Sequence, residues 1–231
     1  MTASVAPERL HEADDATAVK TTIVVPAYNE EGGLAVVLEK LLRATDSDGS
    51  YEILVVDDGS TDRTLEVAQR YPVRVVVHTA NAGKAEAMRT GIREARGENV
   101  IFIDADDTYP TEAIPALSAA LDRYDMVVGS RVGGHVNIPA IFRNSIRYLY
   151  GFRPYDPLTG FYGLKKVHLE RMRLTSGGFR IESEIAIKAA RMGLSTHDIA
   201  VQYMPRIGEA KLRGLPDGVA SFQTIVSMLF L

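Results

Sequence analysis

Five short apolar runs, rich in Val and Ile, recur along the first 130 residues of this chain, and stretches with helical spacing lie between them. The runs cover residues 21–25, 51–56, 73–77, 100–103 and 126–128. Runs that are apolar on both faces are typical of buried parallel strands. The intervening stretches repeat apolar residues at i, i+3, i+4 and i+7, as amphipathic helices do. This alternation predicts an α/β fold: an open, doubly wound, mostly parallel sheet with helices on both faces.

Composition narrows the class of protein. With 231 residues, 46% of them hydrophobic, the chain can bury the core of one domain. It contains no cysteine, which excludes disulfides, zinc–thiolate sites and thiol nucleophiles. Residues 1–20 are polar and acidic, so we expect a flexible N-terminal tail, no signal peptide and a cytoplasmic protein. No run approaches the ~20 apolar residues that span a bilayer.

Charge is distributed unevenly along the chain. The net charge is −4, yet residues 131–173 hold eight Lys or Arg against two acids, which gives +6 there and −10 elsewhere. A basic segment in an acidic protein indicates a localised anionic partner. The change of composition near Ser130 is the one candidate boundary, between a nucleotide-binding half and a second half.

Polar residues follow four of the predicted strands. In a doubly wound sheet, ligands bind beyond the carboxyl ends of the strands, where helix N-termini and free amides converge. The polar clusters at those ends are residues 26–30, 57–62, 81–84 and 104–107. Their joint position predicts an enzyme whose site lies at this edge of the sheet.

The cluster after the fourth run has the clearest chemistry. Asp104 and Asp106 leave an extended strand at positions i and i+2, so their side chains are expected on the same side. Two such carboxylates can share a hard divalent ion such as Mg²⁺ or Mn²⁺. The alternative is that these acids cap a helix beginning near Thr111, but a cap needs one acid and not three. We therefore predict a metal at Asp104 and Asp106.

The other clusters admit a structural role beside the functional one. Glu30 suits the acidic first turn of a helix. Asp57 could hold a base or ribose hydroxyl, while Ser60 or Thr61 could cap the next helix. Lys84 stands at a helix N-terminus, where cations are disfavoured, so it is expected to face a diphosphate; a solvated surface lysine is the alternative.

Two segments of the second half are also ambiguous. Asp156 precedes a proline and is either a turn former or a catalytic acid. Arg206 and Lys211 bracket Gly208 in what is either a phosphate-binding arm or a solvated loop.

Taken in this order, the clusters resemble the family 2 inverting glycosyltransferases of GT-A fold, over about residues 21–212. The segments that carry the resemblance are 25–30, 56–62, 81–84 and 104–106. Within that family, residues 156–161 and 206–211 look like segments of polyprenyl-phosphate glycosyltransferases, the dolichyl-phosphate mannosyltransferases among them. The resemblance implies a Rossmann-like GT-A sheet, a UDP- or GDP-sugar donor and a lipid-phosphate acceptor.

The resemblance also implies roles for individual residues. The residues expected to bind the nucleotide sugar are Pro26, Ala27, Tyr28, Glu30, Asp57, Lys84, Asp104, Ala105 and Asp106. Those expected to act in catalysis are Asp104, Asp106, Arg131, Asp156, Arg206 and Lys211. The three cations of the second set would meet phosphates of donor or acceptor. Two positions depart from the pattern: Thr108 stands where many mannosyltransferase relatives have Gln, and Ala210 where Ser is usual.

On this basis we divide the chain into a tail (1–20), a GT-A domain (21–215) and a C-terminal amphipathic or apolar helix (216–231). The domain comprises a nucleotide-sugar-binding half (21–130) and an acceptor half (131–215). Residues 138–150 mix apolar side chains with Arg143 and Arg147, which suits either a membrane interface or a helix packed on the sheet. Residues 219–231 either lie on a membrane or complete the core.

These features predict a peripheral protein on the cytoplasmic face of a membrane. A separate membrane subunit or a second copy of the chain are candidate partners, and no nucleic acid is expected.

The acceptor decides which residues catalysis needs. A lipid phosphate is anionic near neutral pH, because its second pKa is about 6, and needs no strong base. A hydroxyl acceptor would need a carboxylate to take its proton, and Asp156, Glu182 and Glu184 are the candidates.

Four other classes of protein are alternatives to this function. Residues 101–108 also resemble the DxDxT motif of haloacid dehalogenase-type phosphatases, in which Asp104 would be the nucleophile and Asp106 the acid/base. That motif normally lies on the first strand of its domain. A dinucleotide oxidoreductase or P-loop enzyme lacks support, because no glycine-rich turn follows the first run. A non-catalytic nucleotide-sugar-binding module stays open.

Overall fold

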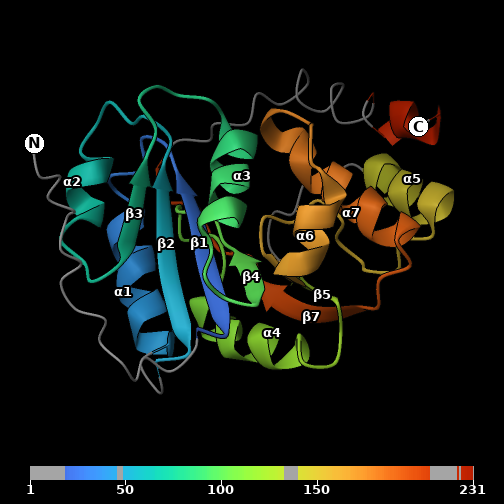
Figure 1. The fold of residues 1–231 in the computed structure, drawn as a ribbon, viewed down its shortest axis with the longest axis horizontal. Helices are drawn as coiled ribbons and strands as arrows, with labels where there is room; N and C mark the ends of the chain where they lie inside the picture. Colours follow the sequence, from blue (N-terminus) through green and yellow to red (C-terminus); the bar gives the residue numbers. More distant parts are fainter. Residues whose placement is uncertain (1–18, 46–48, 133–139, 209–222, 224, 231) are drawn as a thin grey trace, which may run out of the picture.

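A seven-stranded sheet forms the centre of the molecule, with strand order β3-β2-β1-β4-β6-β5-β7 (Figure 1). The computed structural model describes residues 19–45, 49–132, 140–208, 223 and 225–230. The strands are β1 (Thr21–Ala27), β2 (Tyr51–Asp57), β3 (Arg74–Val77), β4 (Asn99–Phe102), β5 (Met126–Val132), β6 (Tyr162–Lys165) and β7 (Thr196–Gln202). Among these strands only β6 pairs antiparallel with its neighbours. The predicted fold class is confirmed, and all five predicted strands are present.

Helices cover both faces of the sheet (Figure 1). The α-helices are α1 (Leu34–Thr45), α2 (Thr64–Ala68), α3 (Lys84–Glu94), α4 (Ile114–Ala120), α5 (Ala140–Tyr150), α6 (Lys166–Met172) and α7 (Ile181–Arg191). Short 3₁₀ turns are η1 (Thr111–Ala113), η2 (Gly178–Arg180) and η3 (Met228–Phe230). Helices α1 and α4 pack on one face, and α3, α6 and α7 pack on the other.

The sheet separates two hydrophobic cores because neighbouring residues of a strand point to opposite faces. In β1, Val24 packs with α3, whereas Ile23 and Val25 pack with α1, and all three are fully buried. Helix α3 lies so close that a Cβ on Gly91 would come 2.3 Å from Val24. Full burial of such side chains contributes about 1.5–3 kcal/mol each, so β1 anchors both layers.

The C-terminal turn and α5 lie together at one end of the molecule (Figure 1). Ile225 and Met228 are buried in the core that contains α7, and the Tyr150 hydroxyl donates to the Ile225 carbonyl. Helix α5 buries Ile146 but leaves Tyr148 85% exposed. Within the described residues, the C-terminal segment therefore completes the core. No helix in the described ranges has both the length and the apolar character needed to cross a membrane.

Candidate active site

A cavity of about 540 Å³ opens at the carboxyl ends of β1 and β4. Its lining comprises Pro26, Ala27, Tyr28, Glu30, Asp58, Asn81, Gly83, Lys84, Ala87, Asp104, Ala105, Asp106, Gly178, Phe179 and Arg206. The set includes every residue predicted to bind the nucleotide sugar except Asp57. Of the other predicted catalytic residues, Arg206 lines the cavity, Arg131 and Asp156 do not, and Lys211 lies outside the described residues.

Lys84 is buried between two carboxylates. It begins α3, and its Nζ lies 2.8 Å from Asp104 Oδ1 and 2.8 Å from Glu182 Oε1. Its side chain is 17% exposed and lies over the Phe179 ring. Burial opposes the charge, but Asp104 and Glu182 outweigh it and raise the pKa of Lys84 well above its usual value. The alternative of a solvated surface lysine is wrong.

Asp106 forms an ion pair with a second cation that lines the cavity. Arg206 Nη2 lies 2.6 Å from Asp106 Oδ2, and the Thr108 hydroxyl donates to Oδ1 at 2.6 Å. Arg206 reaches this place because the chain after β7 pairs with the 106–108 turn, where Ile207 N–H donates to the Asp106 carbonyl at 2.9 Å. Burial and the nearby Asp104 carboxylate raise the pKa of Asp106, against the effect of Thr108 and Arg206.

The acids after β4 do not cap a helix. Asp106 accepts from Thr108, and Asp107, with a left-handed φ of 60°, pairs with Lys40 at 2.7 Å. The next helical turn, η1, has no side-chain cap. The capping alternative is therefore wrong. Among the described residues, no group of three or more His, Asp or Glu side chains is arranged to hold a metal ion.

Two glycines allow the backbone to approach the acidic turn closely. A Cβ on Gly160 would lie 2.4 Å from Asp104 Oδ2, and one on Gly33 would lie 2.6 Å from the Ala105 carbonyl oxygen. Gly160 is held there because its N–H donates to the Tyr109 hydroxyl at 2.8 Å. Gly160, which leads into the antiparallel strand β6, therefore packs directly against the Asp104 side chain. Neither glycine is among the site residues predicted from the sequence.

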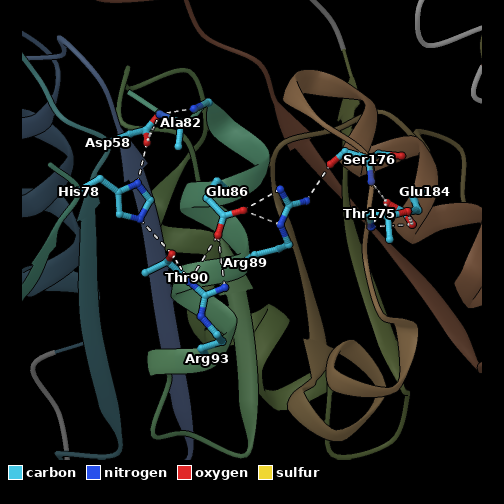
Figure 2. A network of polar contacts seen from close by, with 11 residues as sticks. Asp58, His78, Ala82, Glu86, Arg89, Thr90, Arg93, Thr175, Ser176 and Glu184 are labelled. Atoms are coloured by element: carbon cyan, nitrogen blue, oxygen red, sulfur yellow. Dashed lines mark hydrogen bonds and ion pairs between the residues drawn. The ribbon is translucent and has the colours of Figure 1, made fainter. Parts of the chain in front are cut away.

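Asp58, and not Asp57, lines the cavity. Asp57 accepts hydrogen bonds from the N–H and hydroxyl of Ser60. Asp58 accepts from Ala82 N–H at 3.0 Å and Gly83 N–H at 2.7 Å, and so fixes the turn that leads to Lys84 (Figure 2). Asp58 was not predicted, because nothing in the sequence distinguishes these two adjacent acids.

The expected helix cap is also corrected. Helix α2 begins at Thr64, whose N–H donates to Asp62 Oδ1 at 2.9 Å. Ser60 instead binds Asp57, and Thr61 N–H donates to Asn29 Oδ1 at 2.8 Å. These contacts join the turns after β1 and β2, which both border the cavity.

Figure 2 shows a polar network that runs from Asp58 to the loop before α7. His78 bridges Asp58, at 2.7 Å, and Thr90, at 2.9 Å. Further along α3, Arg89 pairs with Glu86 at 2.8 Å and donates to the Ser176 carbonyl at 2.8 Å. The network ties α3 to the loop that precedes Phe179.

Glu184, in the first turn of α7, binds the same loop and does not line the cavity. It accepts from Thr175 N–H at 3.0 Å and Ser176 N–H at 2.7 Å (Figure 2). It also pairs with Lys188 at 2.7 Å. Burial opposes the charged form, but Lys188 and the two amides lower the pKa of Glu184. These contacts indicate a structural acid.

Arg131 and Asp156 form a closed pair away from the cavity lining. Arg131 Nε and Nη2 donate to the two Asp156 oxygens at 2.5 and 3.0 Å, and Nη2 also donates to the Leu158 carbonyl. Their side chains are 12% and 2% exposed. The structure therefore assigns this pair to holding the 156–160 turn, which carries Gly160.

Residues 22–182 match the family described as glycosyl transferase family 2. The chain belongs to this family. The dolichol-phosphate mannosyltransferase of Pyrococcus furiosus is 34% identical over 213 residues, which cover 85% of this chain but only 60% of that protein. A dolichyl-phosphate hexose transferase of Haloferax volcanii is 30% identical over 215 residues, covering 89% of this chain and 92% of that protein. Family membership sets the phosphatase alternative aside.

Solved structures agree on the fold. Glucosyl-3-phosphoglycerate synthase of Mycobacterium tuberculosis, in complex with Mn²⁺, UDP and glucosyl-3-phosphoglycerate, superposes with a TM-score of 0.75 at 24% identity. The match covers 92% of this chain and 80% of that one. The sheet described above is thus a GT-A sheet.

Proposed function

We propose that this protein transfers a sugar, with inversion, from a nucleoside-diphosphate donor to a polyprenyl phosphate, and that it uses Mg²⁺ or Mn²⁺. One observation carries the proposal: Asp104 and Asp106 face a single cavity at the carboxyl end of β4, with Lys84 and Arg206 beside them. The relatives named above, which are dolichyl-phosphate transferases, support the acceptor class.

The carboxylates suit a hard divalent cation. Carboxylate oxygens are the ligands that Mg²⁺ and Mn²⁺ prefer. Burial and the neighbouring Asp104 carboxylate raise the pKa of Asp106, and a cation held by both carboxylates would relieve the repulsion between them. When bound, the metal would stabilise the charge on the departing diphosphate. The structural neighbour crystallised with Mn²⁺ and UDP supports this choice.

The protein's own residues would bind and align the donor. The turn after β1 presents Pro26, Ala27 and Tyr28 to the cavity as a surface for the nucleoside. Lys84 and Arg206 supply positive charge for the phosphates. Alignment of acceptor oxygen, anomeric carbon and leaving diphosphate then supports one displacement, in which the new C–O bond forms as the old one breaks.

The positions of the candidate bases favour a phosphate acceptor. Asp156 is engaged by Arg131, Glu184 by Lys188 and two amides, and Glu182 by Lys84. None of the three is among the residues that line the cavity. A phosphate oxygen needs no base near neutral pH, whereas a hydroxyl acceptor does. This observation supports the lipid-phosphate acceptor over the hydroxyl one.

Helix α5 supports contact with a membrane surface. Tyr148 and Leu149 are exposed beside Arg147, and Arg143 stacks over Tyr155. Exposed aromatic and cationic side chains of this kind suit the headgroup region of an anionic bilayer. The proposal therefore includes a peripheral location on the cytoplasmic face of a membrane. A membrane subunit and a second copy of the chain are the further partners proposed.

A transfer assay tests the function. The purified chain is incubated with Mg²⁺ or Mn²⁺, a panel of UDP- and GDP-sugars and a short polyprenyl phosphate, and products are identified by mass spectrometry. We expect a lipid-phosphate-linked sugar and the nucleoside diphosphate. A parallel arm offers 3-phosphoglycerate, because the structural neighbour holds its glucosylated form. Transfer only in that arm would favour the hydroxyl-acceptor alternative, and donor binding without transfer would favour a binding module.

A further inference from the structure

Glu182 is a buried acid to which neither the fold nor the proposed chemistry has given a role. It lies in the first turn of α7 and its side chain is 6% exposed. Oε1 lies 2.8 Å from Lys84 Nζ, while Oε2 has no hydrogen-bond partner among the described residues. A buried carboxylate is costly unless it is paired, so Lys84 is its essential counter-charge.

The Lys84 ammonium is shared. Its distances to Asp104 Oδ1 and Glu182 Oε1 are equal, at 2.8 Å. A divalent ion bound to Asp104 would compete with Lys84 for that carboxylate and repel the ammonium. Glu182 is then the acid that can keep Lys84 in place.

Favourable helix electrostatics is the simpler explanation for an acid at this position. Glu184 stands in the same turn, however, and bonds the loop amides of Thr175 and Ser176. Glu182 turns instead to Lys84 on α3. Helix α7 holds it firmly, since Ile181 and Ile185 are fully buried.

We propose that Glu182 is a positioning residue that retains Lys84 at the cavity wall when Asp104 binds a metal ion. Lys84 thereby stays within reach of the donor diphosphate. The inference rests on the proposed function and deepens it, because it assigns how one site accommodates both a divalent ion and a lysine. Without Glu182, metal binding would leave a buried ammonium with no counter-charge.

A double-mutant cycle tests the inference. Mn²⁺ binding without nucleotide, and UDP and GDP binding with Mn²⁺, are measured by calorimetry for wild type, Glu182→Gln, Lys84→Met and the double variant. We expect Glu182→Gln to weaken Mn²⁺ binding about tenfold, as loss of a charged hydrogen bond would. In the Lys84→Met background the same change should have less than about a twofold effect. Equal losses in both backgrounds would overturn the inference.

Two further variants guard against a trivial result. Glu184→Gln removes a buried acid from the same turn without touching Lys84, so Mn²⁺ affinity should stay within about twofold even if the melting temperature falls. Glu182→Asp keeps the charge but shortens the side chain that reaches Lys84, so it should fold even if Glu182→Gln does not. It should weaken Mn²⁺ binding less than Glu182→Gln does, and only in the background that retains Lys84. A Glu182→Asp variant with unchanged Mn²⁺ and nucleotide affinity in both Lys84 backgrounds counts against the inference.

The two hypotheses fail separately. A protein that transfers no sugar to any acceptor, yet shows the Lys84-dependent effect of Glu182, refutes the proposed function and supports the inference. A protein that transfers sugar but loses Mn²⁺ affinity equally in both backgrounds refutes only the inference.

Discussion

Asp104 with Lys84 and Asp156 with Arg131 are two acid–base pairs of similar composition but different surroundings. The first borders the cavity, and its lysine is shared with a second acid. The second is closed, because Arg131 donates to both oxygens of Asp156 and to the Leu158 carbonyl. The sequence assigned a catalytic role to both aspartates.

Burial and ion pairing are common to the two pairs and do not distinguish them. Both pairs are largely buried, and in both a carboxylate lies within ion-pair distance of a cation. What separates them is whether partners can be exchanged. Lys84 has a second acid to which it can turn, whereas the bidentate Arg131–Asp156 geometry leaves neither side chain an alternative.

The largest expected effect is at the first pair. Asp104→Asn should lower transfer activity by on the order of a thousandfold, because the site would lose a carboxylate proposed to hold the divalent ion that faces the leaving diphosphate. The fold should survive, since Lys84 keeps Glu182. Activity with Mn²⁺ and thermal unfolding are measured together. Asp107→Asn is the matched control: this acid pairs with Lys40 outside the cavity lining and should retain activity within a few-fold.

The second pair should behave in the opposite way. Asp156→Asn leaves a buried guanidinium without its charge partner and should lower the free energy of unfolding by about 3–5 kcal/mol. Activity per folded molecule at low temperature should fall far less than in Asp104→Asn. Urea unfolding with parallel activity measurements checks this. An Asp156→Asn protein of unchanged stability but no activity would return the residue to the catalytic set.

Gly160 links the two pairs and gives an intermediate effect. An alanine methyl would lie 2.4 Å from Asp104 Oδ2, so the carboxylate must move. Displacement on this scale should cost about ten- to a hundredfold in activity. Gly32→Ala is the control, because its Cβ would meet Ile207 at an ordinary 3.7 Å. Equal activity of the two variants would show that the wall beside Asp104 does not matter.

The smallest expected effect concerns an acid remote from the cavity. Burial opposes its charge, but hydrogen bonds from Ser195, Lys165 and His168 hold the pKa of Asp125 well below its usual range. A lowered folded-state pKa stabilises the fold above the unfolded value, about 3.9, and this contribution is lost as the pH falls further. Asp125→Asn should cost about 1 kcal/mol at pH 7 and less near pH 2. The free energy of unfolding of wild type and Asp125→Asn is measured at both pH values. An equal difference between the two proteins at pH 7 and near pH 2 would contradict the prediction.

The sequence predicted the sheet and one edge of it well. Apolar runs ending in polar clusters are local signals, and strands β1 to β5 lie where those runs predicted them. Pro26, Lys84 and Asp106 converge because parallel strands end at the same edge, a property of the fold class.

Features that depend on contacts between residues far apart in the chain could not be predicted from the sequence. Nothing local distinguishes Asp57 from Asp58; the choice follows from the turn at Ala82 and Gly83, which only the fold brings near. The antiparallel insertion of β6 between β4 and β5 was equally invisible, and with it the approach of Gly160 to Asp104.

The insertion of β6 has a consequence for how such a protein can be divided. β5 precedes residue 133, yet its two neighbours in the sheet, β6 and β7, both come from later in the chain. A fragment ending near residue 130 would leave β5 unpaired and expose the edge of β4 next to Asp104 and Asp106. An engineered variant with a new acceptor segment would therefore have to retain residues 160–165, which join β4 to β5, even if the surrounding loops were exchanged.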